Sequence, residues 1–290
     1  MLASTSPSSL VRRRVAAGAA RRIARGVYVL PGPEPGRSDD TWARIAGVQR
    51  RLTGHVFSHE SAAFLHGLPL WRQSSRVHVY QPSSASSRSD RTVVRHTPLP
   101  PDEHVVDLLG TRATALARTV WDCATTMPPA GAFVVVDAAL HAGLPRDELT
   151  LLATGAAGRR GAGRGRAVLD FADEGAESPP ESVCRFRALL AGLPVPTTQI
   201  PVRTHTGNYW ADLGWPEWRL LLEYDGRVKY PDSSAFMAEK RRHDSIVETG
   251  WRIVRLTAVD LRTQADFERR LREHVPAAAW PRARRRELTW

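Results

Sequence analysis

The stretch that decides the fold runs from Tyr209 to Tyr230 and reads Y-W-A-D-L-G-W-P-E-W-R-L-L-L-E-Y-D-G-R-V-K-Y. Its pattern predicts a β-hairpin. A first strand covers residues 210–213, turn signals follow at 214–217, and a near-continuous apolar strand covers 219–224. The Asp-Gly pair at 225–226 ends that second strand, as expected for a buried strand.

The predicted hairpin carries three acidic residues, Asp212, Glu223 and Asp225. Residues directly opposite each other in an antiparallel pair share one face, and so do residues i and i+2, so an even-length turn places all three carboxylates together. Such a cluster costs stability unless a cation neutralises it. Mg²⁺ or Mn²⁺ takes oxygen ligands and acts on phosphates. The alternative is that Asp212 and Asp225 are turn residues and Glu223 is a strand-edge charge.

Bulk composition sets wider bounds. A chain of 290 residues has room for two domains, and 42% hydrophobic residues suffice for a core. The formal net charge of +11 suits a polyanion such as DNA, although a compositional bias toward arginine explains part of it. The distant pair Cys123 and Cys184 predicts reduced thiols and a cytoplasmic location. We expect no membrane association, because no apolar run approaches spanning length.

The N-terminal region predicts part of a winged helix-turn-helix: a helix at 10–17 and then a hairpin within 19–30. The chain supplies fewer helices than a full module needs, so the module is partial or the start codon is assigned too late. Its basic face would contact DNA phosphates, unless it is simply a solvated helix. The arginines concerned are Arg12, Arg13, Arg14, Arg21, Arg22 and Arg25.

The next segment predicts an α+β domain. Helices are expected at 40–52, 57–67, 113–124 and 130–141, and strands at 76–80 and 92–96. The histidines of this segment show no metal-ligand spacing, so we expect packed or surface side chains. They are His55, His59, His66, His78 and His96.

Three stretches carry a resemblance: R-R-I-A-R-G-V-Y-V-L (21–30), S-H-E-S-A-A-F-L-H-G-L-P-L (58–70) and A-R-T-V-W-D-C-A (117–124). Together they resemble the AbiEi family, the antitoxins and transcriptional regulators of type IV toxin–antitoxin systems. The resemblance covers roughly residues 8–150. It implies DNA binding through the N-terminal winged helix and a toxin as partner.

The C-terminal part predicts the order helix, strand, strand, strand, helix, strand, helix. A Gly/Arg-rich linker and helix at 154–176 separates it from the α+β domain, which gives predicted domains at 1–52, 53–153, 154–176 and 177–290. Ser178-Pro179-Pro180-Glu181 is a typical helix start, with Glu181 one turn from Arg185 and able to pair with it.

The ordered series E-S-P-P-E-S-V-C-R-F-R-A-L-L (177–190), the hairpin, E-K-R-R-H-D (239–244) and G-W-R-I-V-R-L-T (250–257) resembles a known nuclease fold. It is similar to the PD-(D/E)XK restriction-endonuclease-like superfamily, and within it to the very-short-patch-repair type. The resemblance implies an α/β fold with a mixed sheet flanked by helices. By residue match, Glu181 is the helix glutamate, Asp212 the family aspartate and Glu223 the acidic partner.

The family lysine, two residues after the acidic partner, is Asp225 here. The candidate substitutes are the only two lysines of the chain, Lys229 and Lys240. The expected activity is metal-dependent DNA endonuclease, with Mg²⁺ or Mn²⁺ held by Asp212, Glu223 and Asp225. Glu181 and Lys229 would assist catalysis, and Arg241 and Arg242 would contact the DNA. Two alternatives stay open: a non-catalytic DNA-binding regulator or antitoxin, and a module that neutralises a toxin partner.

Overall fold

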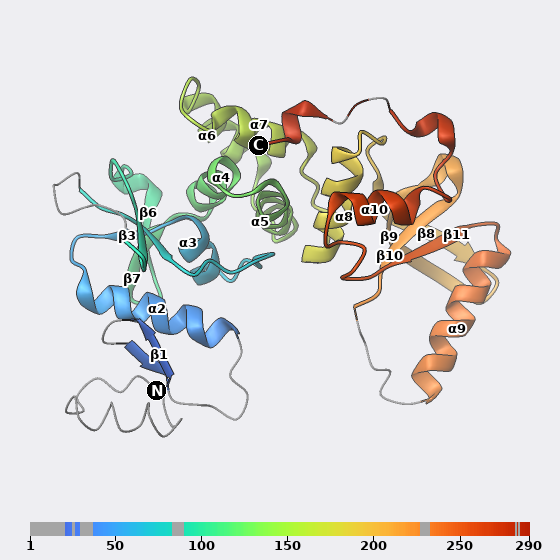
Figure 1. Ribbon diagram of the computed structural model, residues 1–290, viewed down its shortest axis with the longest axis horizontal. Coiled ribbons are helices and arrows are strands. Elements are labelled where there is room, and N and C mark those ends of the chain that lie inside the picture. The colour runs from blue at the N-terminus through green and yellow to red at the C-terminus, as the bar shows by residue number, and fades with distance from the viewer. Residues whose placement is uncertain are drawn as a thin grey trace. The chain divides into compact units, whose positions relative to one another are not determined.

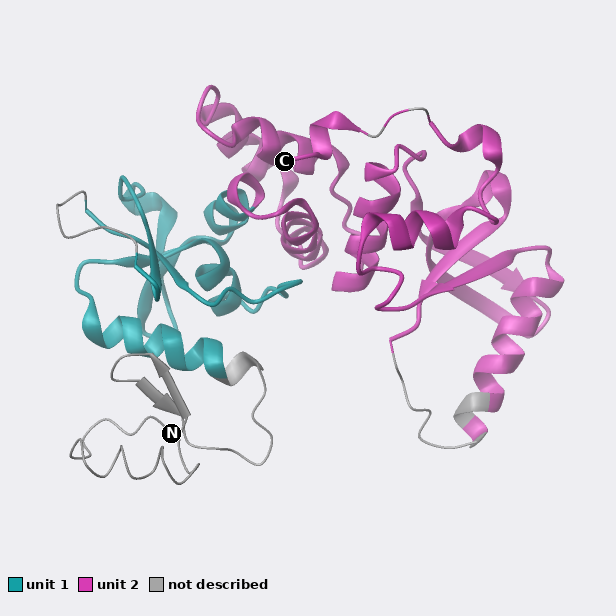
Figure 2. Cartoon of the chain, viewed as in Figure 1, with its two compact units in different colours: residues 1–123 teal, residues 124–290 magenta. Residues whose placement is uncertain are grey.

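The computed structural model describes residues 21–24, 27–29, 37–82, 90–226, 233–281, 283 and 285–290 (Figure 1). The chain is an α/β protein with two mixed sheets flanked by helices, and it divides into two compact units, Met1–Cys123 and Ala124–Trp290 (Figure 2). The division falls within α4 (Leu116–Thr126), inside the predicted 53–153 domain. None of the helices described is long and apolar enough to cross a membrane.

The first unit begins with a two-stranded antiparallel ribbon, β1 (Arg21–Ala24) and β2 (Val27–Val29), which confirms the hairpin predicted within 19–30. The predicted helix at 10–17, with Arg12, Arg13 and Arg14, lies outside the described residues, as does Arg25. For Arg21 and Arg22 only the backbone is described. The helix α2 (Arg37–Arg51) follows, beginning three residues before the predicted start at 40.

A five-stranded sheet with the order β5-β4-β3-β7-β6 forms the centre of this unit. The pairs β3–β4 and β6–β7 are antiparallel, and the pairs β3–β7 and β4–β5 are parallel. The strands are β3 (Val56–Phe57), β4 (Val77–Tyr80), β5 (Val93–His96), β6 (Val105–Leu108) and β7 (Thr111–Thr114). Strands β6 and β7 are not predicted from the sequence, and α4 starts three residues later than the predicted 113 because Ala113 and Thr114 belong to β7.

Alternation along β4 separates an apolar face from a polar one. Val77 and Val79 are buried in one cluster with Ile45 and Val48 of α2. Successive side chains of a strand point to opposite faces, so His78 lies on the other face. The helix α3 (His59–Leu65) contacts β4, with Ser58 in the extended conformation at its N-cap.

The second unit begins with helices. These are α5 (Pro129–His141), α6 (Arg146–Gly155), α7 (Ala162–Phe171) and α8 (Pro179–Leu190). The helix α6 is not predicted, and α7 lies within the predicted linker-and-helix segment. α5 packs against α8, where the rings of Phe133 and Phe186 lie 5.4 Å apart and Asp137 pairs with Arg185.

The four-stranded sheet of this unit has the order β11-β10-β9-β8, with only the β10–β11 pair parallel. Its strands are β8 (Thr197–Thr204), β9 (Gly207–Trp215), β10 (Leu220–Tyr224) and β11 (Arg252–Leu256). α9 (Ser233–Glu248) connects β10 to β11 and packs Ile246 onto Leu221, and α10 (Gln264–Leu271) follows β11. The predicted order of elements from 177 onward is thereby confirmed.

Candidate functional site

The register of the β9–β10 ribbon decides where its carboxylates lie. Leu220 pairs with Trp215 and Leu222 with Leu213, so four residues, 216–219, make the turn. This confirms the even-length turn, and continuing the register brings Asp212 beside Glu223. Gly214 allows the close approach of the strands, because a Cβ there would overlap the carbonyl oxygen of Leu220.

The pairing of β9 with β10 stops at Leu222, and Asp212 occupies the point where it stops. Asp212 Oδ2 accepts a hydrogen bond from the backbone N–H of Tyr224 over 3.0 Å. On the other side of β9, the pairing with β8 skips the position of Asp212, and the β8 residue at the gap, Gln199, has a φ of 48°. The local departure from a regular ladder therefore centres on Asp212.

Glu223 is buried, with 8% of its surface exposed, and it is held by two arginines. Arg242 of α9 donates from Nη2 to Glu223 Oε1 over 2.6 Å, and Arg255 Nε of β11 lies 3.8 Å from Glu223 Oε2. Glu239 contacts both arginines and extends the group into a network. A buried strand carboxylate requires such partners, because an uncompensated charge in the interior is costly.

Glu181 lies in the first turn of α8 and caps that turn. Ser178 is the N-cap, and its hydroxyl donates to Glu181 Oε1 over 2.6 Å. The backbone N–H of Glu177 donates to Glu181 Oε2 over 2.9 Å. The backbone N–H of Glu181 in turn donates to Ser178 Oγ over 3.4 Å, so the arrangement is a variant of the capping box in which Glu177, rather than the N-cap residue, donates to the carboxylate. The expected Glu181–Arg185 pair does not form: Arg185 donates to Asp137 Oδ2 over 2.9 Å instead.

The neighbouring carboxylates of Glu181 and Glu223 act on Asp212. Burial raises the pKa of Asp212 to about 6, opposed by the hydrogen bond from Tyr224, while the charges of Glu181 and Glu223 raise it further and that of Arg242 lowers it. Burial, Asp212 and Glu181 likewise raise the pKa of the Cys184 thiol. A carboxylate with a pKa raised in this way is typical of catalytic sites, although structural networks produce one too.

The other predicted site residues do not all join the group of Glu181, Asp212 and Glu223. Asp225 is exposed, and its backbone N–H donates to Leu256 O over 2.8 Å. Arg241 is exposed on α9, whereas Arg242 is engaged with Glu223. Lys229 lies outside the described residues. The assignments of Asp225, Lys229 and Arg241 to the site stay predictions.

One cluster was missed by sequence reasoning: His59, His78 and His96 in the first unit. Of the residues that the structure describes, these are the only three His, Cys, Asp or Glu residues whose ligand atoms all lie within 4.8 Å of one another. His78 and His96 come together because β4 pairs with β5 in parallel. The spacing of the histidines in the sequence does not reveal that pairing.

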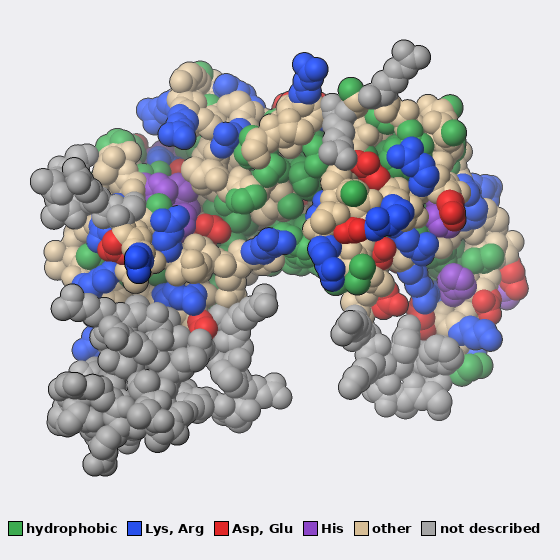
Figure 3. Space-filling model, viewed as in Figure 1, with side chains coloured by type: hydrophobic (Ala, Val, Ile, Leu, Met, Phe, Trp, Pro, Cys, Tyr) green, Lys and Arg blue, Asp and Glu red, His purple; other side chains and the backbone are tan. Residues whose placement is uncertain are grey.

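Basic side chains are widely distributed on the surface. On the face of the molecule in view, lysines and arginines are spread over both units and interleaved with aspartates and glutamates (Figure 3). The whole chain carries a formal net charge of +11.

Comparison with known proteins gives relatives and no function. No family model matches the chain. Two proteins of Mycobacterium tuberculosis, uncharacterized protein MT2308 of strain CDC 1551 / Oshkosh and uncharacterized protein Rv2248 of strain ATCC 25618 / H37Rv, are each 30% identical over 246 residues. The match covers 84% of this chain and 87% of each relative. The crystal structure of the RV2827C protein from Mycobacterium tuberculosis matches with 21% identity and a TM-score of 0.37, over 68% of this chain and 77% of that one. The identity and coverage shared with the two uncharacterized proteins establish that this chain belongs to their family.

Proposed function

We propose that the chain is a metal-dependent DNA endonuclease whose site lies where β10 separates from β9. The observation that carries the proposal is the placement of Asp212 beside the buried Glu223, with Glu181 close enough to raise the pKa of Asp212. The sequence resemblance to PD-(D/E)XK nucleases points to the same three carboxylates.

The donor set suits a hard divalent cation, because it consists of carboxylate oxygens. Asp212 and Glu223 would hold Mg²⁺ or Mn²⁺, and Asp225 would join them only after its exposed side chain turns inward. Glu223 has both oxygens facing arginines, so Arg242 has to release Oε1 for a cation to bind there. Such a cation supplies charge stabilisation at the phosphate and a more acidic bound water.

The residues around this position have distinct roles in the proposal. Glu181 adds negative charge beside Asp212 and strengthens the attraction for a cation. Once released from Glu223, Arg242 is free to contact a DNA phosphate, and the exposed Arg241 adds positive charge on the same helix. Lys229, which lies outside the described residues, is the further cation that the sequence suggests for the scissile phosphate. A cytoplasmic location, where DNA is accessible, belongs to the same proposal.

The N-terminal region has a regulatory role in this proposal, based on its resemblance to AbiEi antitoxins. The β1–β2 ribbon that follows the arginine-rich segment is consistent with the wing of a winged helix. It would contribute DNA binding, and a toxin protein is the partner that the resemblance implies.

Plasmid cleavage by the purified full chain tests the proposal. Supercoiled DNA is incubated with wild type, Asp212→Asn, Glu223→Gln and the control Glu217→Gln, in Mg²⁺, Mn²⁺ or EDTA. Glu217 is an exposed residue in the turn of the same ribbon, so its variant matches the charge change without touching the site. We expect metal-dependent nicking that both site variants lose and Glu217→Gln retains. Equal nicking by all four proteins would refute the assignment.

A second function, a non-catalytic DNA-binding regulator or antitoxin, is favoured by one specific observation. Arg242 and Arg255 already neutralise Glu223, so the folded structure needs no cation at that carboxylate. DNA retention that weakens steeply with salt, without cleavage in either metal, would support this function. Rescue of cells from a neighbouring toxin gene would identify the antitoxin form.

A further inference from the structure

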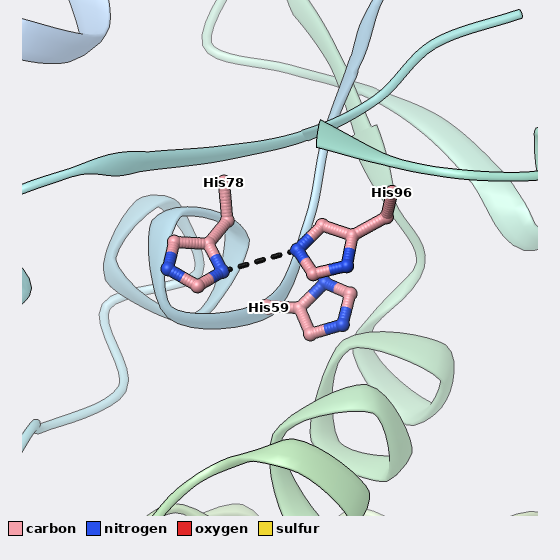
Figure 4. A group of neighbouring side chains, drawn as sticks. All are labelled: His59, His78 and His96. Atoms are coloured by element: carbon pink, nitrogen blue, oxygen red, sulfur yellow. Dashed lines mark hydrogen bonds between the residues drawn. The ribbon is translucent and has the colours of Figure 1, made fainter. Parts of the chain in front are cut away.

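The face of the first sheet that is turned away from Val77 and Val79 carries three histidines from three different elements (Figure 4). His59 is the first residue of α3, His78 lies on β4 and His96 on β5. The parallel register sets His96 opposite Tyr80, and Tyr80 shares a face with His78 by alternation along β4. Backbone pairing therefore fixes the placement of two of the rings.

The separation of the ring nitrogens fits a shared metal ion. His78 Nδ1 and His96 Nε2 lie 3.2 Å apart, and one nitrogen of each of the three rings lies within 4.8 Å of the others. Two nitrogens bound to one tetrahedral Zn²⁺ at about 2.0–2.1 Å are separated by about 3.3 Å. The His59 ring stacks on that of His96 with centroids 3.7 Å apart and planes 14° from parallel. Coordination by all three rings would turn one of these two out of the stack.

Two further contacts orient the rings from outside. His78 Nε2 lies 3.1 Å from Glu60 Oε2, which leaves Nδ1 directed at His96. His59 Nδ1 lies 2.9 Å from Ser58 Oγ, a contact that orients this ring beside His96. A metal-binding histidine usually has its second nitrogen held by a carboxylate or another oxygen in this way.

We propose that His59, His78 and His96 bind one transition-metal ion of the Zn²⁺ type through three imidazole nitrogens. The donor set is nitrogen only, which suits Zn²⁺ and not the hard Mg²⁺ ion. Three protein ligands leave a fourth position of a tetrahedral ion open to water or to a small anion. The site lies in the first unit and does not rest on the proposed nuclease function.

The burial of the cluster prepares the rings for metal. His59 is 2% exposed and the other two are half-buried, so an ion can enter from the side of His78 and His96. Burial and mutual repulsion lower the pKa of His78 to about 3, and burial lowers that of His96 to about 4. The rings are therefore neutral at pH 7, which is the form that ligates metals.

Direct metal binding by the full chain tests the proposal. Protein stripped with EDTA is titrated with Zn²⁺ against a chromophoric chelator, and with Co²⁺, whose visible absorption reports a four-coordinate nitrogen site. We expect one Zn²⁺ per chain, binding lost in His78→Ala and His96→Ala, and binding kept in His104→Ala. His104 is a matched control because its side chain lies outside the cluster in the same unit. Glu60→Gln should weaken binding by about 10–100-fold, as loss of an orienting carboxylate does.

Two controls keep the result decisive. Circular dichroism shows whether each variant is folded. Wild type alone gives a second readout: Zn²⁺ should raise its melting temperature and protect its histidines from diethylpyrocarbonate. Asp212→Asn should bind Zn²⁺ as wild type does. The proposal is overturned if wild type binds no Zn²⁺, if a folded His78→Ala or His96→Ala binds it unchanged, or if Asp212→Asn alone loses it.

Discussion

Arg242 donates from Nη2 to Glu223 Oε1 over 2.6 Å, and this contact ties α9 to the end of β10. The same nitrogen lies 3.3 Å from the carbonyl oxygen of Trp210 on β9, so one guanidinium bridges three elements around the candidate site. Because Glu223 is largely buried, Arg242 both stabilises the fold and competes with any cation for that carboxylate.

Removing this guanidinium should separate its two effects. Arg242→Gln leaves a largely buried Glu223 without its closest donor, so we expect a loss of about 1–3 kcal/mol of unfolding free energy. The freed Oε1 should also bind Mn²⁺ more tightly, which isothermal titration measures. Arg241→Gln is the matched control, because it removes the same charge from the exposed neighbouring position. Equal Mn²⁺ affinities in the two variants would contradict competition at Glu223.

The buried pair Asp137–Arg185 should be the most sensitive ionic contact of the second unit. Asp137 is 0% exposed and lies 2.9 Å from Arg185 Nη1, which belongs to a different helix. Asp137→Ala takes the closest carboxylate from a buried cation, which keeps only Asp173 at 3.6 Å and the carbonyl of Phe171, and should lower the free energy of unfolding in urea by about 3–5 kcal/mol. Asp170→Ala, on the exposed face of α7, should change stability by less than about 0.5 kcal/mol. Similar losses in both variants would mean that the pair has no special role.

The close approach within the β9–β10 ribbon can be tested at Gly214. A methyl group there would overlap the Leu220 carbonyl, so Gly214→Ala should lower the free energy of unfolding by more than the roughly 1–3 kcal/mol of an overpacked site. It should also displace the Asp212 carboxylate from the backbone N–H of Tyr224. Gly163→Ala is the opposite case, since open space surrounds this helical position, and it should stabilise by about 0.5–1 kcal/mol. The melting temperatures of both variants test this prediction, and an unchanged melting temperature in Gly214→Ala would disprove the tight packing.

The sequence predicted the elements whose signals are local. The ribbon is predicted because an apolar run and a turn lie next to each other, and an even-length turn puts Asp212 and Glu223 on one face; the register itself comes from the structure. Strands β6 and β7 were missed because V-V-D-L and T-R-A-T are short and partly polar, without a clear alternation. Helix α6 is not predicted although Asp147 and Glu148 mark its first turn, because the Gly/Arg-rich segment that follows has the composition of a linker.

Contacts between distant segments were beyond such reasoning. Arg185 has Glu181 one turn away, yet it pairs with Asp137 because it faces the interior between α5 and α8. The partners of Glu223 depend on the parallel register that sets Arg255 opposite it, and a chain rich in arginine gives no hint of which one is chosen. The clustering of histidines from α3, β4 and β5 has the same origin in tertiary pairing.

The histidine cluster should also make stability fall in mild acid. The pKa of His96 is lowered to about 4 by burial, whereas an unfolded histidine titrates near about 6.5. Between these values the unfolded chain takes up a proton that the folded chain does not, so stability present above pH 6.5 is lost as the pH falls toward 4. Burial raises the pKa of Asp122 to about 6, so protonation of Asp122 favours the folded state as the pH falls. The contribution of His96 therefore has to be isolated by comparing wild type with a variant. Urea unfolding in EDTA at pH 7 and pH 5 should show a smaller loss for His96→Gln than for wild type. The control His104→Gln should follow wild type, and an unchanged loss in His96→Gln would show that His96 is protonated equally in both states.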